Sequence, residues 1–472
     1  SSDVCSSDLD IFRADSLRDI FYTQIFPKKI LGVDRITVSN FEKNLDGHLD
    51  VVVRKCLAGT YQFTPYLLSL MAKGPGKIPR EISIPCVRDR LVLKALTNFL
   101  HEVFSDCVSK DLPNTVIKKI KASLNEQPEE TGFIQLDFRN FYGSIPQDQL
   151  LSKIQLRITD DAVISLIRRA IKNPTLPANY KKEERKNKSK IGVSQGLAVS
   201  NILAEIYLQS FDQSVAENCL IYRRFVDDVF ILCKKDRASE AWEKIIAEDK
   251  ASNLELNKEK SSTEGVCISL DQGFDFLGYS FKSADLISVR ESSYNRFIHS
   301  LIGRITRFRH ELTSKIDKDV ISQIFIDELN ERITGALDEN KRYGWVFFFC
   351  EITDEELLNR IDRVLRKNLD RIPGFDQSKI KRVVRARYEA LHSPRRGYIR
   401  DYNAFTLEDK IAFLNLRDIL KVDGQYTEDQ IEIIPIDHNT WNLDLNYLDK
   451  LEPNSCLLLV HNLGNIIPIN II

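Results

Sequence analysis

The sequence predicts an α+β fold, because helical and strand patterns alternate along the chain. Apolar residues recur at helical spacing from Leu49 to Leu57. By contrast, residues 220–233 (LIYRRFVDDVFILC) are apolar at both ends with two adjacent Asp residues in the middle, a pattern typical of two short strands joined by a tight turn. The length of 472 residues predicts roughly two to four domains with a sizeable core.

The other elements follow in order from residue 11. Gly and Pro break the pattern at 73–77 (KGPGK), and 181–190 (KKEERKNKSK) has no apolar face, so we interpret the latter as a solvated loop. The remaining predictions are strands at 80–85, 133–138 and 274–281, helices at 87–104 and 238–248, a loop leading into a helix at 192–212, and a basic helix at 294–312 that carries Arg296, Arg304, Arg307 and Arg309.

Charge separates sharply towards the C-terminus. Residues 360–400 hold 13 basic against 4 acidic residues, whereas residues 401–472 hold 4 against 12. This change places a candidate domain junction at 394–401 (PRRGYIRD), followed by a small appendage with strands near 430–434 and 456–460. At the other end, residues 1–9 (SSDVCSSDL) form a near-duplicated polar stretch, so we interpret 1–10 as a tag or artefact.

The amino-acid composition is typical of a folded globular protein. Apolar residues make up 43% and charged residues 29%, which excludes disorder and low complexity. The sequence contains no run of about 18 apolar residues, the length that a membrane-spanning helix needs. Nine Cys without CxxC or zinc-type spacing favour reduced thiols in a cytoplasmic protein. Because the net charge is only −1, any site for a polyanion must be local.

Three acids stand out as candidate metal ligands. Asp137 ends a predicted strand, and Asp227 and Asp228 occupy the predicted turn of 220–233. Adjacent carboxylates among apolar residues repel one another and lose hydration, and a divalent cation would remove that cost. Mg²⁺ prefers oxygen ligands, and two ions about 3.5–4 Å apart activate a 3′-hydroxyl and stabilise a leaving pyrophosphate. The alternative is that the Asp pair marks an exposed hairpin turn.

A series of motifs around these acids resembles the fingers and palm motifs of reverse transcriptases. The upstream stretch 32–62 is similar to the N-terminal extension of the bacterial branch that includes group II intron, retron and abortive-infection enzymes, and the likeness spans roughly 31–371. In order, the motifs are REISIP at 80–85, LDFRNFYGSIP at 136–146, SQGLAVSN at 194–201, FVDD at 225–228, NKEK at 257–260 and FLGY at 276–279.

The resemblance implies a role for each matching position. Asp137 and Asp227 would be the metal ligands together with the Phe138 carbonyl, and Asp228 the supporting second acid. Lys260 would be the general acid for pyrophosphate departure, although a surface Lys in a polar turn is an equal alternative.

The remaining matches imply nucleotide contacts. Tyr142 would exclude the ribose 2′-hydroxyl, and Gln195 with Gly196 would touch the incoming nucleotide. Arg80, with Lys77 as a looser candidate, would hold the triphosphate. The alternatives are a core aromatic for Tyr142, an ordinary helix-entry turn for the loop and solvated charge for both cations. Separately, 276–279 matches the primer grip, and a packed hairpin is compatible with that role.

Departures from the family pattern point to its divergent members. Ser194 and Asn201 stand where Pro is usual, and Phe225 stands where Tyr is usual. These departures favour the bacterial enzymes of phage defence over intron-encoded or retroviral enzymes. The last hundred residues show no maturase zinc site, HNH endonuclease pattern or RNase H carboxylate set.

The resemblance implies a right-hand polymerase with an antiparallel palm, a helical thumb and a C-terminal appendage. The expected divisions are an N-terminal extension with fingers at 11–130, a palm at 131–285 with an insert at 147–191, a thumb at 286–371 whose basic surface grips phosphates, and a C-terminal extension at 372–472 that is basic and then acidic.

The implied activity is RNA-directed DNA synthesis from deoxynucleoside triphosphates, with two Mg²⁺ ions or Mn²⁺ in their place, in antiviral defence. The implied partners are an RNA template, a DNA or RNA primer and a dedicated non-coding RNA, without a membrane, and a homo-oligomer is left open. Two alternatives also stay open: a template-independent or protein-primed DNA polymerase of the same fold, and a non-catalytic RNA-binding scaffold.

Overall fold

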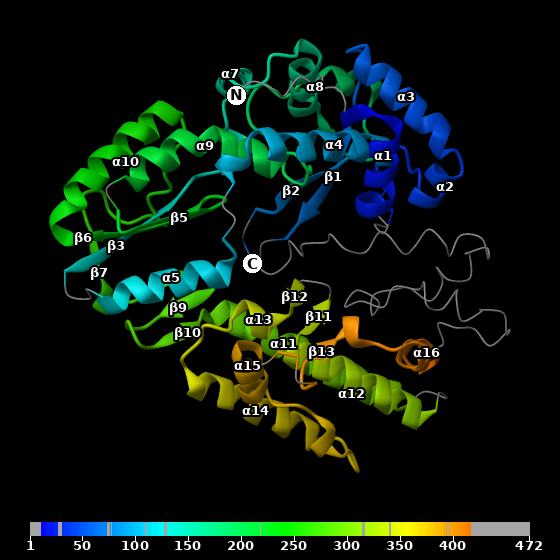
Figure 1. Ribbon diagram of the computed structural model, residues 1–472, viewed down its shortest axis with the longest axis vertical. Helices are drawn as coiled ribbons and strands as arrows, with labels where there is room; N and C mark the ends of the chain where they lie inside the picture. The colour runs from blue at the N-terminus through cyan, green and yellow to red at the C-terminus, as the bar shows by residue number, and fades with distance from the viewer. Residues whose placement is uncertain are drawn as a thin grey trace. The chain divides into compact units, whose positions relative to one another are not determined.

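The chain divides into two compact units in the computed structural model (Figure 1). The first unit comprises residues 1–110 and 130–268, and the second comprises 111–129 and 269–472. The structure describes residues 11–26, 31–72, 76, 78–108, 111–126, 130–217, 219–313, 317–338, 341–392, 394–395 and 397–416.

The first unit contains two sheets surrounded by helices. One sheet has the order β2-β1-β4, with β1 (Tyr66–Met71) antiparallel to β2 (Arg80–Ile84) and parallel to β4 (Thr175–Leu176). The other has the order β5-β6-β3-β7. Its strands are β3 (Thr131–Asp137), β5 (Ile221–Phe225), β6 (Asp228–Lys234) and β7 (Ile268–Ser269). The helices are α1 (Ala14–Ile20), α2 (Val38–Glu42), α3 (Leu45–Leu57), α4 (Val87–Val103), α6 (Phe141–Ser144), α7 (Gln147–Gln155), α8 (Asp161–Lys172), α9 (Ser200–Ala216) and α10 (Ala238–Ser252).

The four-stranded sheet forms the core of this unit. β3 and β6 lie at its centre, and their apolar residues are almost all buried, as expected for strands covered on both faces. Phe133 and Phe230, on these two strands, stack with ring centroids 6.1 Å apart. α9 packs against β5, and α10 packs against both α9 and β6 (Figure 1). This sheet therefore gives a rigid base to whatever lies at its strand ends.

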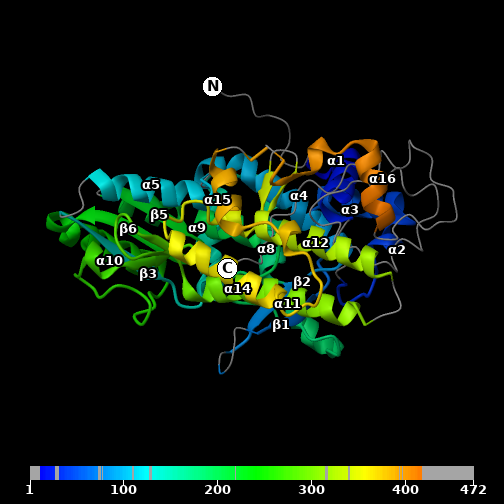
Figure 2. The ribbon, with the colours of Figure 1, turned by 90° about the horizontal axis from the view of Figure 1, so that it is seen from below.

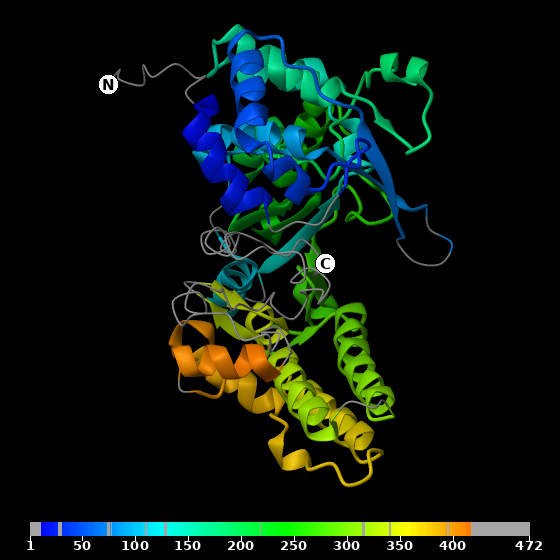
Figure 3. The same ribbon diagram turned by 90° about the vertical axis from the view of Figure 1, so that its right-hand side faces the viewer.

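The β1–β2 hairpin projects from the helices of the first unit (Figure 3). Its register pairs Met71 with Arg80, and the outer residues Leu70 and Met71 are exposed. β2 begins at the position where the sequence predicts a strand. Lys77, a candidate triphosphate contact, lies outside the described residues.

The second unit is mainly helical and carries two small sheets, of order β10-β9-β8 and β12-β11-β13. α12 and α14 both pack against α11, and α14 also packs against α15 (Figure 2). The strands are β8 (Phe274–Phe276), β9 (Tyr279–Phe281), β10 (Ile287–Val289), β11 (Ala336–Asp338), β12 (Lys341–Tyr343) and β13 (Arg400–Asp401). The helices are α5 (Pro113–Glu126), α11 (Glu291–Glu311), α12 (Lys318–Thr334), α13 (Trp345–Phe348), α14 (Glu355–Leu369), α15 (Val383–His392) and α16 (Leu407–Leu416).

Two sequence-based interpretations of the second unit are wrong. Arg304 was expected on an exposed basic face of α11, but it is 3% exposed and pairs with Glu311 and Glu328. The predicted junction at 394–401 also fails, because Arg400 and Asp401 form β13, which pairs in parallel with β11 of the same unit. A change in charge therefore did not mark a boundary.

Several other expectations concern residues outside the described part of the chain. These are the tag at 1–10 and the strands near 430–434 and 456–460. Where the structure describes the chain, no helix combines the length and apolarity needed to cross a membrane. The described cysteines are free thiols. The prediction of an α+β fold with antiparallel sheets is confirmed.

Candidate active site

Two neighbouring strands bring the three predicted acids together. Asp137 ends β3 and Asp228 begins β6, and these two residues are direct partners in the antiparallel register. Directly opposed residues of an antiparallel pair carry their side chains on the same face, with Cβ atoms about 4.5–5.5 Å apart. Asp227 precedes Asp228 in the turn between β5 and β6. Residues some 90 positions apart in sequence thus meet at one edge of the sheet.

The carboxylate of Asp137 is buried and held by two donors. Lys260 Nζ lies 2.9 and 3.1 Å from its two oxygens, and Asn257 Nδ2 donates to Oδ1 at 3.0 Å. The hydrogen bond with Asp137 and the charges of the three acids raise the pKa of Lys260. Lys260 is therefore an ammonium group that faces the acids.

Backbone pairing places Lys260 beside Asp137. Asn257 N donates to the Asp137 carbonyl at 2.7 Å, and Asp137 N donates to Ser261 Oγ at 3.0 Å. On either side of Asp137, Arg139 N donates to the Glu255 carbonyl and Ser262 N donates to the Gln135 carbonyl. The segment 255–262 therefore runs alongside β3, and the position of Lys260 follows from this pairing.

The electrostatics of Asp227 favour a bound cation. Burial raises its pKa, the negative charge of Asp137 raises it further, and the charges of Lys260 and Arg80 lower it. Arg80 is exposed at the start of β2, and it lies close enough to Asp227 to lower the pKa of that carboxyl. Additional positive charge near Asp227 would stabilise its ionised form.

The carboxylates suit a divalent cation chemically, but their present arrangement is that of acids neutralised by a lysine. Within the described ranges, no group of three or more His, Cys, Asp or Glu side chains is arranged to hold a metal ion. Oxygen donors are nonetheless the ligands that Mg²⁺ prefers. Asp137 and Asp227 fit such an ion provided that the Lys260 ammonium gives way.

The loop of Gln195 and Gly196 is fixed between β2 and α6. Ser83 N donates to the Gln195 carbonyl at 2.7 Å, and Val193 N donates to the Tyr142 carbonyl at 2.7 Å. Gly196 has φ +97°, and a Cβ there would lie 2.7 Å from Ile82 Cγ2. Only Gly fits this close approach to β2. The loop therefore joins the strand of Arg80 to the helix of Tyr142.

Tyr142 lies on α6, where the charge of Asp227 affects its pKa. Its hydroxyl donates to Asn201 Oδ1 at 3.3 Å. Burial raises its pKa to about 12, with contributions from the charges of Glu205 and Asp227. The hydroxyl is therefore neutral at physiological pH and stands within electrostatic range of Asp227. This position is compatible with contact to a nucleotide sugar.

Sequence reasoning missed several residues of this neighbourhood. Asn257 lies in the NKEK motif at 257–260, but nothing in the sequence indicates that its side chain donates to Asp137 or that Ser261 Oγ accepts from Asp137 N. The same is true of Arg224, whose buried side chain bonds to Glu205 and Asp212. Their partners are remote in sequence, so only the folded chain reveals them.

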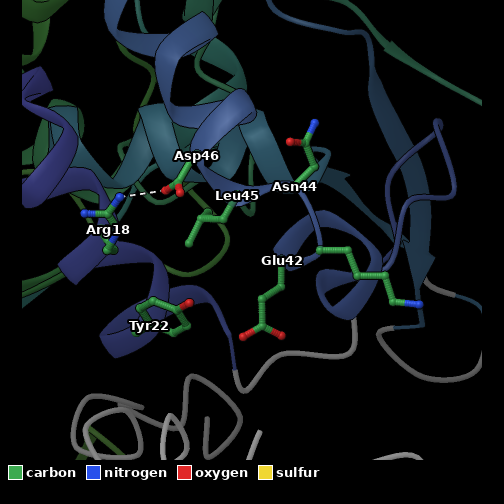
Figure 4. Close-up of a pocket in the computed structure, with 7 residues that line it drawn as sticks. Arg18, Tyr22, Glu42, Asn44, Leu45 and Asp46 are labelled. Atoms are coloured by element: carbon green, nitrogen blue, oxygen red, sulfur yellow. Dashed lines mark hydrogen bonds and ion pairs between the residues drawn. The ribbon is translucent and has the colours of Figure 1, made fainter. Parts of the chain in front are cut away.

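A separate pocket of about 410 Å³ lies among the N-terminal helices (Figure 4). Arg18 points towards Asp46 there and bonds to it at 2.6 Å. The pocket is lined by Arg18, Tyr22, Glu42, Lys43, Asn44, Leu45 and Asp46. None of the candidate site residues belongs to this pocket.

Comparison with known families shows what this part of the chain is similar to. Residues 72–281 match the family described as reverse transcriptase (RNA-dependent DNA polymerase). This part of the chain, a little under half of its length, is similar to reverse transcriptases. The matched span contains all three acids, and its fold is the predicted mixture of helices and antiparallel sheets. The bounds of fingers, palm and thumb stay predictions.

Curated relatives that match part of the chain come from bacteria and yeast. The chain is 25% identical to the protein YkfC of Escherichia coli over 40% of this chain and 51% of that protein. It is 28% identical to the group II intron-encoded protein LtrA of Lactococcus lactis over 36% of this chain and 29% of that protein. An uncharacterized 91 kDa protein in the cob intron of Schizosaccharomyces pombe is also 28% identical, over 35% and 21%.

The matches thus span from about a fifth to about half of the length of these relatives. Among solved structures, telomerase from Candida albicans, in complex with a fragment of telomeric RNA, is similar with 12% identity and a TM-score of 0.43. That likeness covers 73% of this chain and 68% of the telomerase chain.

Proposed function

We propose that this chain is an RNA-directed DNA polymerase that extends a primer by nucleotidyl transfer. The observation that carries the proposal is the register of β3 and β6, which opposes Asp137 to Asp228 and places Asp227 beside them. The match of residues 72–281 to the reverse transcriptase family supports the reaction class. The relatives support RNA as the template, because one of them is encoded by a group II intron.

The acids would hold two Mg²⁺ ions, or Mn²⁺ in their place. Asp137, Asp227 and the Phe138 carbonyl would be the ligands, and Asp228 would add negative charge beside them. When bound, the ions would activate the primer 3′-hydroxyl and stabilise the pyrophosphate. The protein's part is to hold these oxygens on a rigid sheet, since β3 and β6 are buried on both faces.

The cations of the site would act on the triphosphate. Lys260 Nζ carries a proton next to Asp137, so it could donate that proton to the departing pyrophosphate. Arg80 would bind triphosphate oxygens through its guanidinium fork. The Gln195–Gly196 loop, fixed to β2, would form the adjoining wall for the nucleotide.

Tyr142 is expected to select deoxynucleotides, and shortening it should relax that selection. Replacing Tyr142 by Ala removes the ring, so ribonucleotides should gain at least about tenfold in relative kcat/KM. Replacing Tyr142 by Phe keeps the ring and removes only the bond to Asn201, so it is the matched control. The measurement is single-nucleotide incorporation with each triphosphate. Unchanged selectivity in the Ala variant would remove Tyr142 from the sugar contact.

An antiviral role in the cytoplasm belongs to the same proposal. Ser194, Asn201 and Phe225 depart from the pattern of intron-encoded enzymes, and this supports a defence enzyme that uses a dedicated non-coding RNA. Survival of cells that express the chain, challenged with phage, measures that role. Loss of protection in the variant with Asp227 and Asp228 changed to Ala is the expected result. Protection that persists in that variant would favour the scaffold alternative.

Primer extension tests the polymerase directly. The purified chain receives a labelled DNA primer on an RNA template, Mg²⁺ and four deoxynucleotides, with parallel reactions that lack template, primer or metal. We expect extension that requires all three. Label that stays attached to protein on a denaturing gel would instead support protein priming, and extension without template would support a template-independent enzyme. A folded protein that extends nothing under any of these conditions would contradict the proposal.

A further inference from the structure

Arg224 of β5 is a buried cation with an unusually complete set of partners. Its side chain is 3% exposed. Nε and Nη2 donate to the two oxygens of Asp212 at 2.7 and 2.6 Å, in the two-pronged geometry that suits a guanidinium. Nη2 also donates to Glu205 Oε2 at 2.6 Å. Both acids lie on α9, so Arg224 ties the sheet to this helix.

The remaining nitrogen of Arg224 binds the turn that carries the two acids. Nη1 donates to the Val226 carbonyl at 3.1 Å. Val226 has φ +60°, a left-handed conformation that is rare and costly for a β-branched residue. Such a conformation persists only where the surroundings hold it in place. Asp227 and Asp228 follow directly, so their directions depend on this strained residue.

The anchors of Arg224 are themselves firmly placed. Glu205 and Asp212 are seven residues apart, which is about two helical turns, so they share one face of α9. Tyr222 Oη donates to Asp212 Oδ1 at 2.5 Å. Burial alone would lower the pKa of Arg224, but Asp212 and Glu205 outweigh burial and raise it. Arg224, Glu205 and Asp212 therefore form a fixed, charged cluster, which we call the brace, rather than a mobile surface pair.

We propose that Arg224 is a positioning residue that holds the β5–β6 turn in the conformation that presents Asp227 and Asp228. α9 is the support, and the Val226 carbonyl is the point at which the brace acts. This inference rests on the proposed polymerase function for its catalytic consequence. Its structural part, the rigidity of residues 225–228, does not depend on that function.

The first test replaces Arg224 by Lys. An ammonium group keeps the charge but cannot reach two carboxylates and a carbonyl in the same fork. Replacing Arg223 by Lys is the matched control, because the neighbouring side chain points to the other face of the strand and donates to the Tyr222 carbonyl. Hydrogen exchange of the metal-free protein should become faster at 225–228 in the Arg224 variant alone.

A second variant separates the loss of the brace from misfolding of the protein. Arg224→Met, Glu205→Met and Asp212→Asn together remove every charge of the brace, and Asn keeps an acceptor for the Tyr222 hydroxyl. Buried ion pairs replaced by matched uncharged residues are often neutral for stability. We therefore expect the melting temperature of this triple variant to stay near that of the wild type, whereas exchange at 225–228 becomes faster.

The catalytic consequence separates positioning from mere stability. In the triple variant, kcat for nucleotide incorporation should fall by about a hundredfold, with KM for the deoxynucleotide changed much less. Wild-type kcat in a folded triple variant, or exchange at 225–228 equal to the wild type in both Arg224 variants, would overturn the inference. If the wild type itself incorporates nothing, the polymerase proposal fails, and the exchange result still decides whether the brace exists.

Discussion

Changing Asp227 and Asp228 together to Ala should abolish nucleotide incorporation, with kcat at least about a thousandfold below the wild type. Asp227 is a proposed metal ligand and Asp228 lies opposite Asp137 in the sheet, so the variant loses most of the negative charge at this edge. The measurement is single-nucleotide extension of a primer under saturating deoxynucleotide and Mg²⁺.

The melting temperature of the double variant distinguishes a loss of activity from a loss of the fold. Burial and the charge of Asp137 raise the pKa of Asp227, which means that the folded protein disfavours its ionised form. Removing these acids should therefore leave the melting temperature unchanged or raise it, as is common where function conflicts with stability. Changing Asp236, an exposed acid just beyond the other end of β6, to Ala is the control. Incorporation that survives in the double variant would contradict the metal assignment.

Replacing Arg304 by Ala should lower the free energy of unfolding of the second unit more than a substitution of an exposed residue does. Arg304 pairs with Glu311 at 3.1 Å and with Glu328, and its guanidinium lies 5.1 Å from the Phe325 ring centroid. Without Arg304, the partly buried Glu328 loses its partner. Breaking such a pair costs about 3 kcal/mol, which should lower the melting temperature by roughly ten degrees.

The control for Arg304 lies on the same helix. Arg307 is exposed on α11, so changing it to Ala should alter the free energy of unfolding by less than about 0.5 kcal/mol. Thermal unfolding followed by circular dichroism measures both variants. Equal melting temperatures for the two variants would contradict the structural role of Arg304.

The strand pair around Asp227 could be predicted because its pattern is local. Apolar residues flank the two acids on both sides, and β5 and β6 form as that pattern predicts. β3 is similar, since its apolar run ends at Asp137. The meeting of Asp137 with Asp228 depends on pairing between distant strands, and only the family resemblance made it predictable.

Other features of the site could not be predicted, for physical reasons. Alternation along β5 shows that Arg223 and Arg224 face opposite sides, but it does not show which one is buried. A left-handed Val contradicts the backbone preference of its residue type, so the sequence argues against the conformation found at Val226. The burial of Arg304 could not be predicted, because the sequence of a basic helix does not show which of its cations pairs with an acid on a neighbouring helix.

The most direct test of the account is the position of Mn²⁺ in crystals of the protein with primer, RNA template and deoxynucleotide. Anomalous scattering locates the ion without reference to activity. We expect Mn²⁺ bound to oxygens of Asp137 and Asp227, with Lys260 Nζ displaced from the Asp137 carboxylate. Mn²⁺ bound elsewhere, with the ion pair between Lys260 and Asp137 intact beside the nucleotide, would contradict the account.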